Sequence, residues 1–520
     1  MSTVKNKLCL NFALTKISKK IHTLNFLKKD MNKFSYMLIF TVVTTAVIGC
    51  GGSPKPPVQP SDSSNPYKDD YREVASYESR NSWGTYNIHD PVVRKFNGVY
   101  YAYSTDAIWW PPKKDGEISI NKMPKIGNIQ VRKSKDLISW EFQGWAFDSI
   151  PQEAWNFVYP ISKEKTSHGL WAPYVLEHNG IYRMYYCLST FGEKVSYIGL
   201  AEASSPEGPW TPKGCVVKTD SNSVMNAIDP TVVDDAQNGK QWMIYGSFFG
   251  GIFALELNKE TGLAKTEGDQ GHLVAHRANY KIDNMEAPEC VYNPETKKYY
   301  LFVSYGPLVT TYNVRVTASD KPEGPYKDYF GADSKDEVNT LPVLTAPYRF
   351  ENHSGWAGLA HCTVFNDGNG KWFLASQGRL SPENMLMDFH IRRLFFRSDG
   401  WPMVSPERYA GEEERELSES EIYGEYEFIT IKDNYVTKDL GGTGQSNVLL
   451  DEEVNKSKHL TLSDTNVKKF SNNSFTLNHN GEEIQEIKIF VGHDWENQKT
   501  TLLFTGINKD GFSVWGKKIK

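Results

Sequence analysis

The central part of this 520-residue chain repeats one pattern five times, and this repetition limits the fold more than any other feature. Each copy is a run of β-branched residues, then a turn, then an aromatic-rich alternating run. The copies begin at Ile88, Leu170, Ala227, Met285 and Ala360. Four of the turns contain Asn-Gly or Asp-Gly, which supply the positive φ that tight hairpin turns need. Each copy therefore predicts an antiparallel β-hairpin.

A further strand-like segment follows each hairpin, so each repeat of ~60 to 80 residues holds three to four strands. These segments begin near Asn128, Tyr197, Gly251, Asn313 and Phe389. Small antiparallel sheets repeated around an axis form a β-propeller. We therefore predict an all-β fold with a five-bladed β-propeller over residues 81–410. The insertions Pro111–Met123 and Gln152–Ser167 are expected to be loops on the functional rim.

Carboxylates occur at matching positions when the repeats are aligned on their shared proline. Asp90 and Asp229 directly precede this proline, and Glu286 stands two residues before it. The innermost strands of a propeller line its axis, so matching positions face one another. Acids brought together are costly unless they do chemistry or bind a cation. The pattern favours one functional site over three unrelated turn-capping or solvated acids.

Two well-placed carboxyl groups are what glycoside hydrolysis needs. One is protonated and donates to the leaving oxygen, while the other is ionised and activates water on the opposite face. A third acid can raise the pKa of the donor through its charge. Aromatic residues make up 13% of the chain. Aromatic rings suit a sugar site, although Tyr-rich strands need no ligand.

Around these acids the sequence resembles glycoside hydrolase family 43, and within it the arabinanases. The motifs are Ile88-His-Asp-Pro, Asn226-Ala-Ile-Asp-Pro-Thr, Met285-Glu-Ala-Pro and Tyr245-Gly-Ser-Phe-Phe-Gly-Gly-Ile. The resemblance implies an inverting mechanism, with Asp90 as general base, Glu286 as general acid and Asp229 as modulator of the acid's pKa. It implies cleavage of internal α-1,5-L-arabinofuranosidic bonds of arabinan. An exo-acting arabinanase or arabinofuranosidase and a xylan-related family 43 activity are the alternatives.

The same resemblance implies which residues contact the sugar chain. Leu170-Trp-Ala-Pro and Ser189-Thr-Phe-Gly match segments whose aromatic residues face the sugar in similar enzymes. The segment Tyr245-Gly-Ser-Phe-Phe-Gly-Gly-Ile resembles an arabinanase Gly-Ser-Phe-Trp segment, with Phe249 where Trp is usual. The implied substrate-binding residues are Trp171, Phe191, Asn226, Ser247 and Phe248.

Glu289 is a competing candidate for the general acid. Glu289-Cys290 resembles the Glu-Cys-Pro of retaining, five-bladed fructan hydrolases. No proline follows Cys290, however, and the alignment of the repeats favours Glu286.

His361 occupies the corresponding place in the fifth repeat, within Ala360-His-Cys-Thr. A lone His near a strand is usually a satisfied core residue. Similar arabinanases place a His there on a metal, often calcium, so the resemblance implies one Ca²⁺ on the propeller axis near His361. Calcium prefers oxygen ligands, so water would have to supply most of its coordination.

Residues 1–50 predict a signal peptide, with Met31 as an alternative start. The apolar run Met37–Gly49 is too short to span a bilayer, which takes ~20 residues, and Lys33 precedes it as in secretory signals. The run ends at Cys50 in a sequence that resembles a bacterial lipobox, which implies a lipid on that thiol; an ordinary signal peptide is the alternative. Residues 51–80 are Ser- and Pro-rich and predict an extended tether. We therefore expect an exported protein anchored to a membrane, at the outer-membrane surface or on the periplasmic side.

Residues 411–520 predict a small antiparallel domain, which resembles the β-barrel appended to some arabinanases. The four cysteines beyond Cys50 show no disulfide framework, and three of them lie in or beside apolar runs, as buried thiols do. The net charge of −5 gives no basic footprint for nucleic acid. The expected partner is arabinan or an arabino-oligosaccharide, bound by a monomer. A non-catalytic glycan-binding lipoprotein is the alternative outside enzymes, but it would not need the three acids.

Overall fold

The computed structural model describes residues 79–106, 127–277, 284–308, 311–336, 339–380, 387–432 and 455–520. All of them belong to one compact unit, residues 59–520. Cys50, the leader, nearly all of the tether and the insertion Pro111–Met123 lie outside the described residues. Among the described helices, none is long and apolar enough to cross a membrane.

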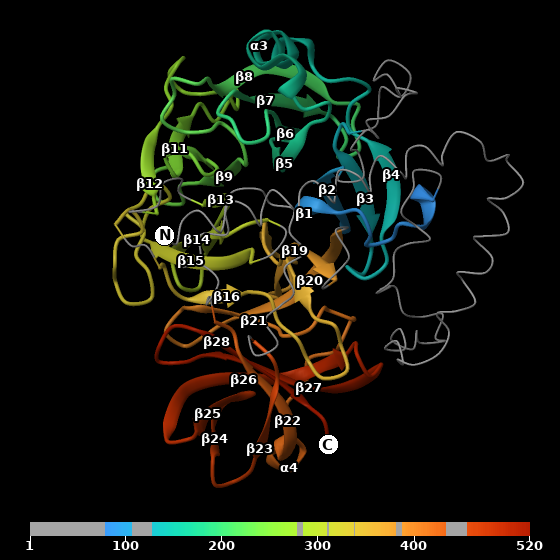
Figure 1. The fold of residues 1–520 in the computed structure, drawn as a ribbon, viewed down its shortest axis with the longest axis vertical. Helices are drawn as coiled ribbons and strands as arrows, with labels where there is room; N and C mark the ends of the chain where they lie inside the picture. Colours follow the sequence, from blue (N-terminus) through green and yellow to red (C-terminus); the bar gives the residue numbers. More distant parts are fainter. Residues whose placement is uncertain are drawn as a thin grey trace, which may run out of the picture. The chain divides into compact units, whose positions relative to one another are not determined.

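Five antiparallel sheets surround a common axis (Figure 1). The inner strands are β1 (His89–Phe96), β5 (Trp171–His178), β9 (Thr231–Asp234), β13 (Met285–Asn293) and β18 (Thr363–Asn366). The second strands are β2 (Val99–Thr105), β6 (Ile181–Leu188), β10 (Gln241–Tyr245), β14 (Lys298–Tyr305) and β19 (Trp372–Leu380). The third strands are β3 (Gln130–Ser134), β7 (Ser196–Ala203), β11 (Ile252–Leu257), β15 (Asn313–Ser319) and β20 (Met387–Phe396). The outer strands are β4 (Glu141–Trp145), β8 (Thr211–Thr219), β12 (His272–Ala275), β16 (Val343–Thr345) and β21 (Pro402–Val404), and β17 (Trp356–Ala357) also pairs with β19.

The inner strands form a closed ring. Each contacts the next in chain order, and β18 contacts β1. Apolar side chains on the facing surfaces of neighbouring blades pack together, as Val93 and Tyr100 of blade 1 do with Phe365 and Phe373 of blade 5. The prediction of a five-bladed propeller is confirmed.

The chain closes the ring by pairing its first described segment with the last blade. The backbone N–H of Asn87 donates to the carbonyl of Met387 at 2.9 Å, and the N–H of Phe389 donates to the carbonyl of Thr85 at 2.9 Å. Residues 85–87 therefore lie along β20 of blade 5, directly before β1 of blade 1. This seam joins the two ends of the propeller by backbone hydrogen bonds.

The second domain is one seven-stranded antiparallel sheet preceded by α4 (Glu419–Ile422). Its strands are β22 (Gly424–Thr430), β23 (Lys458–Leu462), β24 (Val467–Ser471), β25 (Ser474–His479), β26 (Glu482–Asp494), β27 (Lys499–Ile507) and β28 (Ser513–Lys518). Apolar residues of all seven strands meet in a single cluster, so the sheet wraps around its own core. Trp515 points to the other face, where it packs with Tyr348 and Trp356 of the propeller.

The insertion Gln152–Ser167 is not only a loop. Residues Gln152–Ser162 form the helix α3, followed by a 3₁₀ turn, η2 (Lys163–Lys165); another such turn, η1 (Arg80–Ser82), begins the described chain. Ala154, Val158 and Ser162 recur at every fourth position and are buried, which is the spacing of one helix face. The expectation of an irregular rim loop was therefore wrong here.

The cysteines of the described chain are free thiols: Cys187, Cys290 and Cys362 are buried and Cys215 is half-buried. The three buried thiols pack as small apolar groups in the cores between blades.

Candidate active site

All five blades share an unusual backbone conformation at the residue aligned with Asp90, at or just before the start of the inner strand. The residue at this aligned position has a positive φ in every blade: 50° at Asp90, 39° at Ala172, 57° at Asp229, 55° at Ala287 and 50° at His361. Such a backbone is rare outside glycine and costs about 1–3 kcal/mol. A bulge interrupts strand pairing at this place in β1, β5 and β13. Bulges redirect side chains beside active sites, and here they give each blade an equivalent position.

Asp90 is held by its neighbours as an ionised group. Its Oδ1 lies 2.7 Å from Nδ1 of His361, and its Oδ2 accepts a hydrogen bond from the Thr105 hydroxyl at 2.7 Å. The Gln377 side-chain oxygen accepts the Asp90 N–H at 3.2 Å and so supports the strained backbone. Burial raises the pKa of Asp90, but the contact with His361 and the hydrogen bonds outweigh burial and hold it below its ordinary value.

The positive charge beside Asp90 belongs to His361. Burial lowers the pKa of His361, but Asp90 and the more distant Asp229 and Glu286 raise it to about 9. His89 also lies close, with Nε2 at 3.3 Å from Oδ1 of Asp90. Burial lowers the pKa of His89 to about 4, so this ring is neutral at pH 7. One charged imidazole therefore faces a group of three carboxyls.

Glu286 is the second residue of β13, and each of its carboxyl oxygens accepts a hydrogen bond from one hydroxyl. Tyr312 donates to Oε1 at 2.7 Å, and Ser247 donates to Oε2 at 2.8 Å. Ser247 belongs to blade 3, and its backbone pairs with that of Glu286. Burial raises the pKa of Glu286, only partly offset by the two hydroxyls and His361, while Asp90 raises it further. The environment therefore favours a protonated Glu286.

Asp229 interacts electrostatically with both of the other acids. Its Oδ2 accepts the N–H of Ala287, the residue after Glu286, at 3.2 Å. Burial raises the pKa of Asp229, opposed by His361 and increased by the charges of Glu286 and Asp90. Asp229 and Glu286 therefore compete for protons, and a charge on either one favours the protonated form of the other.

Glu289, the competing acid, is fully occupied by structural contacts. Its Oε1 accepts the hydroxyl of Thr363 at 3.1 Å and the N–H of Val364 at 3.2 Å, and its Oε2 accepts the hydroxyl of Thr231 at 3.0 Å. Arg94 lies 3.4 Å from Oε1. Glu289 therefore ties blades 1, 3, 4 and 5 together, and only 3% of the residue is exposed.

A single family model covers the blades and the acids. The model described as "Glycosyl hydrolases family 43" matches residues 79–402, and a "C-terminal lipocalin-like domain" model matches residues 406–516. The chain belongs to glycoside hydrolase family 43. It is accordingly a glycoside hydrolase, as the arrangement of carboxyls predicts.

Several relatives share both sequence and structure with this family 43 chain. An extracellular endo-α-(1→5)-L-arabinanase of Thermotoga petrophila is 29% identical over 83% of this chain and 94% of its own. An extracellular exo-α-(1→5)-L-arabinofuranosidase of Cellvibrio japonicus is 28% identical over 61% of this chain and 86% of its own. The crystal structure of the endo-1,5-α-L-arabinanase of T. petrophila superposes with a TM-score of 0.68 at 26% identity, over 84% of this chain and 99% of that one.

The predicted sugar contacts differ in how far each side chain is exposed. Trp171 begins β5 and is half-buried, Phe248 is half-buried beside Ser247, and Phe191 is 72% exposed on the loop after β6. Asn226 is buried, and its side-chain oxygen accepts the Ser196 hydroxyl at 2.6 Å. Trp171, Phe191 and Phe248 thus present ring surface, whereas Asn226 and Ser247 are tied into hydrogen bonds around the acids.

A second acidic cluster lies where the two domains join. Glu407, Asp494 and Glu496 place possible metal ligand atoms within 4.8 Å of one another. The Lys517 ammonium lies 3.1 Å from Glu407 and 3.0 Å from Asp494, and it also contacts Glu496. The buried ammonium contacts all three carboxyl groups and offsets part of their charge, so it ties the cluster together.

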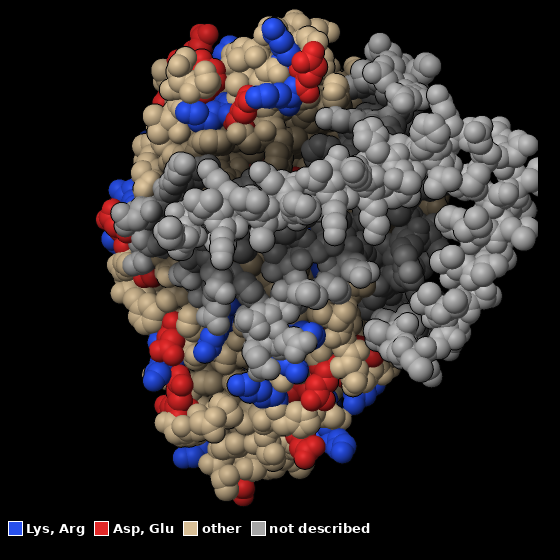
Figure 2. All heavy atoms as spheres, in the orientation of Figure 1, with Lys and Arg blue, Asp and Glu red and all other residues tan. Residues whose placement is uncertain are grey.

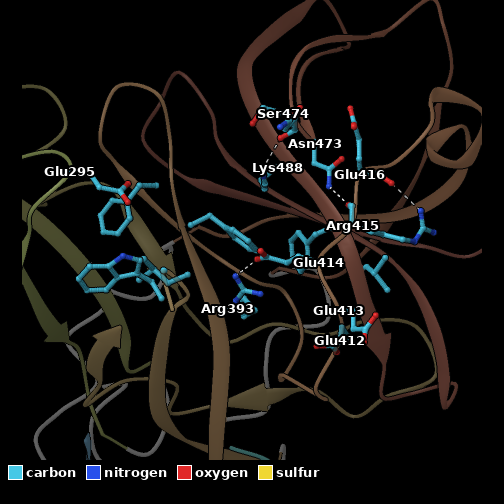
Figure 3. Close-up of a pocket in the computed structure, with 18 residues that line it drawn as sticks. Glu295, Arg393, Glu412, Glu413, Glu414, Arg415, Glu416, Asn473, Ser474 and Lys488 are labelled. Carbon is cyan, nitrogen blue, oxygen red and sulfur yellow. Dashed lines mark hydrogen bonds and ion pairs between the residues drawn. The ribbon is translucent and has the colours of Figure 1, made fainter. Parts of the chain in front are cut away.

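A groove of about 410 Å³ lies between blade 5 and the second domain (Figure 3). Trp372, Phe396 and Lys488 line it together with the acidic segment Glu412–Glu416. Its acids are engaged at the surface, since Glu414 pairs with Arg393 and Glu416 pairs with Lys469. Basic and acidic side chains are also interspersed over the described part of the face in Figure 2. We therefore place the chemistry at the axis and not in this groove.

The structure adds residues that sequence comparison of the repeats does not predict. Tyr312 precedes the third strand of blade 4, and Thr105 ends the second strand of blade 1. Thr105 also accepts the N–H of Ala172 at 2.8 Å, which links blades 1 and 2 at the Asp90 carboxylate. Such residues come from strands that carry no repeated acid, so the alignment gives them no signal.

Proposed function

We propose that this family 43 enzyme is an endo-acting α-1,5-L-arabinanase that hydrolyses arabinan with inversion. The observation that carries the proposal is the trio of carboxyls from blades 1, 3 and 4, of which Asp90 and Asp229 are buried and Glu286 is half-buried. The choice of substrate is supported by relatives from Thermotoga petrophila and Bacillus subtilis that are named endo-arabinanases and match 83% of the chain.

In this proposal Asp90 is the general base and Glu286 the general acid. The low pKa of Asp90 keeps it ionised, so it can take a proton from the attacking water. The raised pKa of Glu286 keeps a proton available for the oxygen of the leaving sugar. Asp229 favours the protonated form of Glu286 whenever Asp229 itself is charged. Trp171, Phe191 and Phe248 would pack against sugar rings, with Asn226 and Ser247 in the polar wall.

The stereochemistry of the product tests this assignment. An inverting enzyme separates its acid and base by ~6.5–9.5 Å to admit a water, whereas a retaining enzyme uses ~5–5.5 Å. We expect the first sugar released from an α-linked chain to have the β configuration at its new reducing end. Proton NMR early in the reaction, before mutarotation, measures this. An initial α product would mean a double displacement and would overturn the proposed roles.

Product analysis separates the alternatives. An endo enzyme releases a range of oligosaccharides from linear arabinan early in the reaction, whereas an exo enzyme releases one short product from the first turnover. Release of a single product would favour the exo activity named for the Cellvibrio japonicus relative. Hydrolysis of xylan-derived substrates instead would favour a different family 43 activity, and binding without hydrolysis would favour a glycan-binding lipoprotein.

We also propose one Ca²⁺ on the axis near His361. The imidazole faces three carboxyls, whose concentrated negative charge a cation would offset. Asp90 holds Nδ1, so a metal at Nε2 would replace the proton and the positive charge that this ring otherwise carries, and its remaining ligands would be water. Bound Ca²⁺ would supply fixed positive charge beside the acids. Chelation should lower the melting temperature of the wild type and leave that of His361→Ala unchanged; an equal response of both would remove the metal from His361.

For location, we propose an exported enzyme held to a membrane by a lipid on Cys50. Three of the relatives compared are named extracellular, which supports export. The proposed substrate is a polysaccharide, and an exported enzyme can meet such a polymer outside the cell.

A further inference from the structure

Helix α3 packs on blade 2 by one face and leaves two flanks (Figure 1). Its buried face carries Ala154 and Val158. On one flank Phe157 approaches Tyr197 of β7, with ring centroids 6.4 Å apart, and the Lys218 ammonium of β8 lies 4.9 Å from the Phe157 ring. This flank therefore faces the outer strand of the blade.

The opposite flank carries a row of three rings: Trp155, Tyr159 and His168, which we call the aromatic row. Trp155 and Tyr159 stack with centroids 4.7 Å apart and planes at 12°. The His168 ring lies 6.5 Å from Trp155 on the segment that leads into β5. Tyr159 is 40% exposed, and His168 is exposed as well. Trp155 is half-buried and packs against the core of the blade, so the ring surface open to solvent comes from Tyr159 and His168.

The aromatic row leads to the start of the inner strand of blade 2. His168 stands three residues before Trp171, at the start of the inner strand β5. The N–H of Ser167 donates to the carbonyl of Ser189 at 2.9 Å, and the backbones of Thr166 and Thr190 form a bridge. Phe191, the most exposed large apolar side chain of the described chain, follows directly. Aromatic rings therefore lie both on this flank of α3 and along the segment that leads into β5.

We propose that the aromatic row is a remote binding site for the arabinan chain, outside the catalytic centre. The inference rests on the proposed arabinanase function. Sugar rings present C–H groups on one face, which pack on aromatic surface, while the Tyr159 hydroxyl and the His168 nitrogens can bond sugar hydroxyls. A long chain that reaches the row is held at two places, whereas a short oligosaccharide occupies the catalytic centre only. The row therefore selects for polymer over short fragments.

The test compares polymer with trisaccharide in the double variant Trp155→Ala/Tyr159→Ala. We expect KM on linear arabinan to rise about tenfold, since two aromatic contacts are lost, with kcat unchanged. On arabinotriose both constants should stay at wild-type values. Affinity electrophoresis in gels that contain linear arabinan should show retardation of the wild type and its loss in the double variant. Circular dichroism and thermal unfolding establish that the double variant is folded.

Matched variants separate binding from packing. Ile161→Ala removes a side chain that is 50% exposed on the other flank of α3 and should leave all constants unchanged. Tyr159→Phe keeps the ring and should retain most of the polymer affinity. Equal losses on arabinan and arabinotriose, or an Ile161→Ala variant that behaves like the double variant, would overturn the proposal. If arabinan retards the wild type but not the double variant, and the wild type does not cleave arabinan, the proposed activity is refuted. The proposal that the aromatic row binds arabinan would then still stand.

Discussion

Replacing Tyr312 by Phe removes one hydroxyl from the proposed general acid and keeps the buried ring. The hydroxyl donates to Oε1 of Glu286 at 2.7 Å, and such a bond stabilises the ionised carboxylate more than the protonated acid. Burial and the neighbouring carboxylates raise the pKa of Tyr312 well above its usual range, so the hydroxyl keeps its proton over the working pH range. The substitution therefore changes the pKa of Glu286 without changing the charge of residue 312.

The size of the effect follows from this bond. Hydrogen bonds to charged groups contribute about 1.5–3 kcal/mol, and about 1.4 kcal/mol corresponds to one pKa unit. Loss of the donor should raise the pKa of Glu286 by about one unit, since Ser247 still bonds the other oxygen. Activity falls as pH rises through the pKa of the general acid, so the alkaline limb of kcat/KM should move to higher pH. A weaker and less well oriented acid should also lower kcat by about tenfold at the optimum.

Two substrates show whether proton donation is affected. On linear arabinan the leaving sugar needs a proton, so kcat of Tyr312→Phe should fall as stated. On a nitrophenyl arabino-oligosaccharide the leaving phenolate needs little protonation, so the loss should be much smaller. The pH profile of kcat/KM on both substrates is the measurement.

Tyr305→Phe is the matched control, because it removes a buried hydroxyl of the same blade that bonds Thr340 at 3.1 Å and no carboxyl. It should leave the alkaline limb in place. The argument fails if the alkaline limb of kcat/KM for Tyr312→Phe lies at the same pH as that of the control, or at a lower pH. It also fails if the variant loses activity equally on both substrates, because the hydroxyl then does not act through the acid.

Three further predictions concern the acids and the anchor. Asp90→Asn and Glu286→Gln should each lower kcat on linear arabinan by about 10²- to 10⁴-fold with circular dichroism unchanged; near-native activity in Glu286→Gln, with loss in Glu289→Gln, would move the general acid to Glu289. Glu289→Gln should instead lower the free energy of unfolding in urea by about 3 kcal/mol, because Arg94 loses its buried partner, and an unchanged urea midpoint would contradict its structural role. Cys50→Ala should abolish labelling by a radioactive fatty acid and release soluble enzyme, and labelling that survives would refute the lipobox.

The repeats made the blades and the arrangement of the acids predictable because both depend on local spacing. Each hairpin contains its own turn signal, and equivalent positions in successive inner strands face one axis by symmetry. Asp90, Asp229 and His361 could therefore be placed together from sequence, and all three share the positive φ that their alignment implies. The choice of Glu286 over Glu289, which stays a prediction, agrees with the structural contacts that occupy Glu289.

Contacts between strands that occupy different places in their blades, such as an inner strand and a third strand, could not be predicted in this way. Tyr312 lies directly before the third strand of its blade and reaches Glu286 from there. Its position therefore depends on the segment that connects β14 to β15. The seam between residues 85–87 and β20 joins segments about 300 residues apart, and no repeated pattern marks it. Helix α3 was missed because its four-residue spacing of buried side chains is short and is interrupted near its end by Pro160.

The shared positive φ at the start of every inner strand has a consequence for how this enzyme could change. Ala172 and Ala287 have the same left-handed backbone as Asp90, Asp229 and His361. Both side chains stop at Cβ, and both residues are buried, with 3% of Ala172 and 2% of Ala287 exposed. A larger side chain at either position would start from the same backbone as the acids and His361, but it would need space among the neighbouring side chains. The repeated backbone therefore sets where a further acid, base or ligand could enter the site, and the packing around each alanine sets which side chains fit.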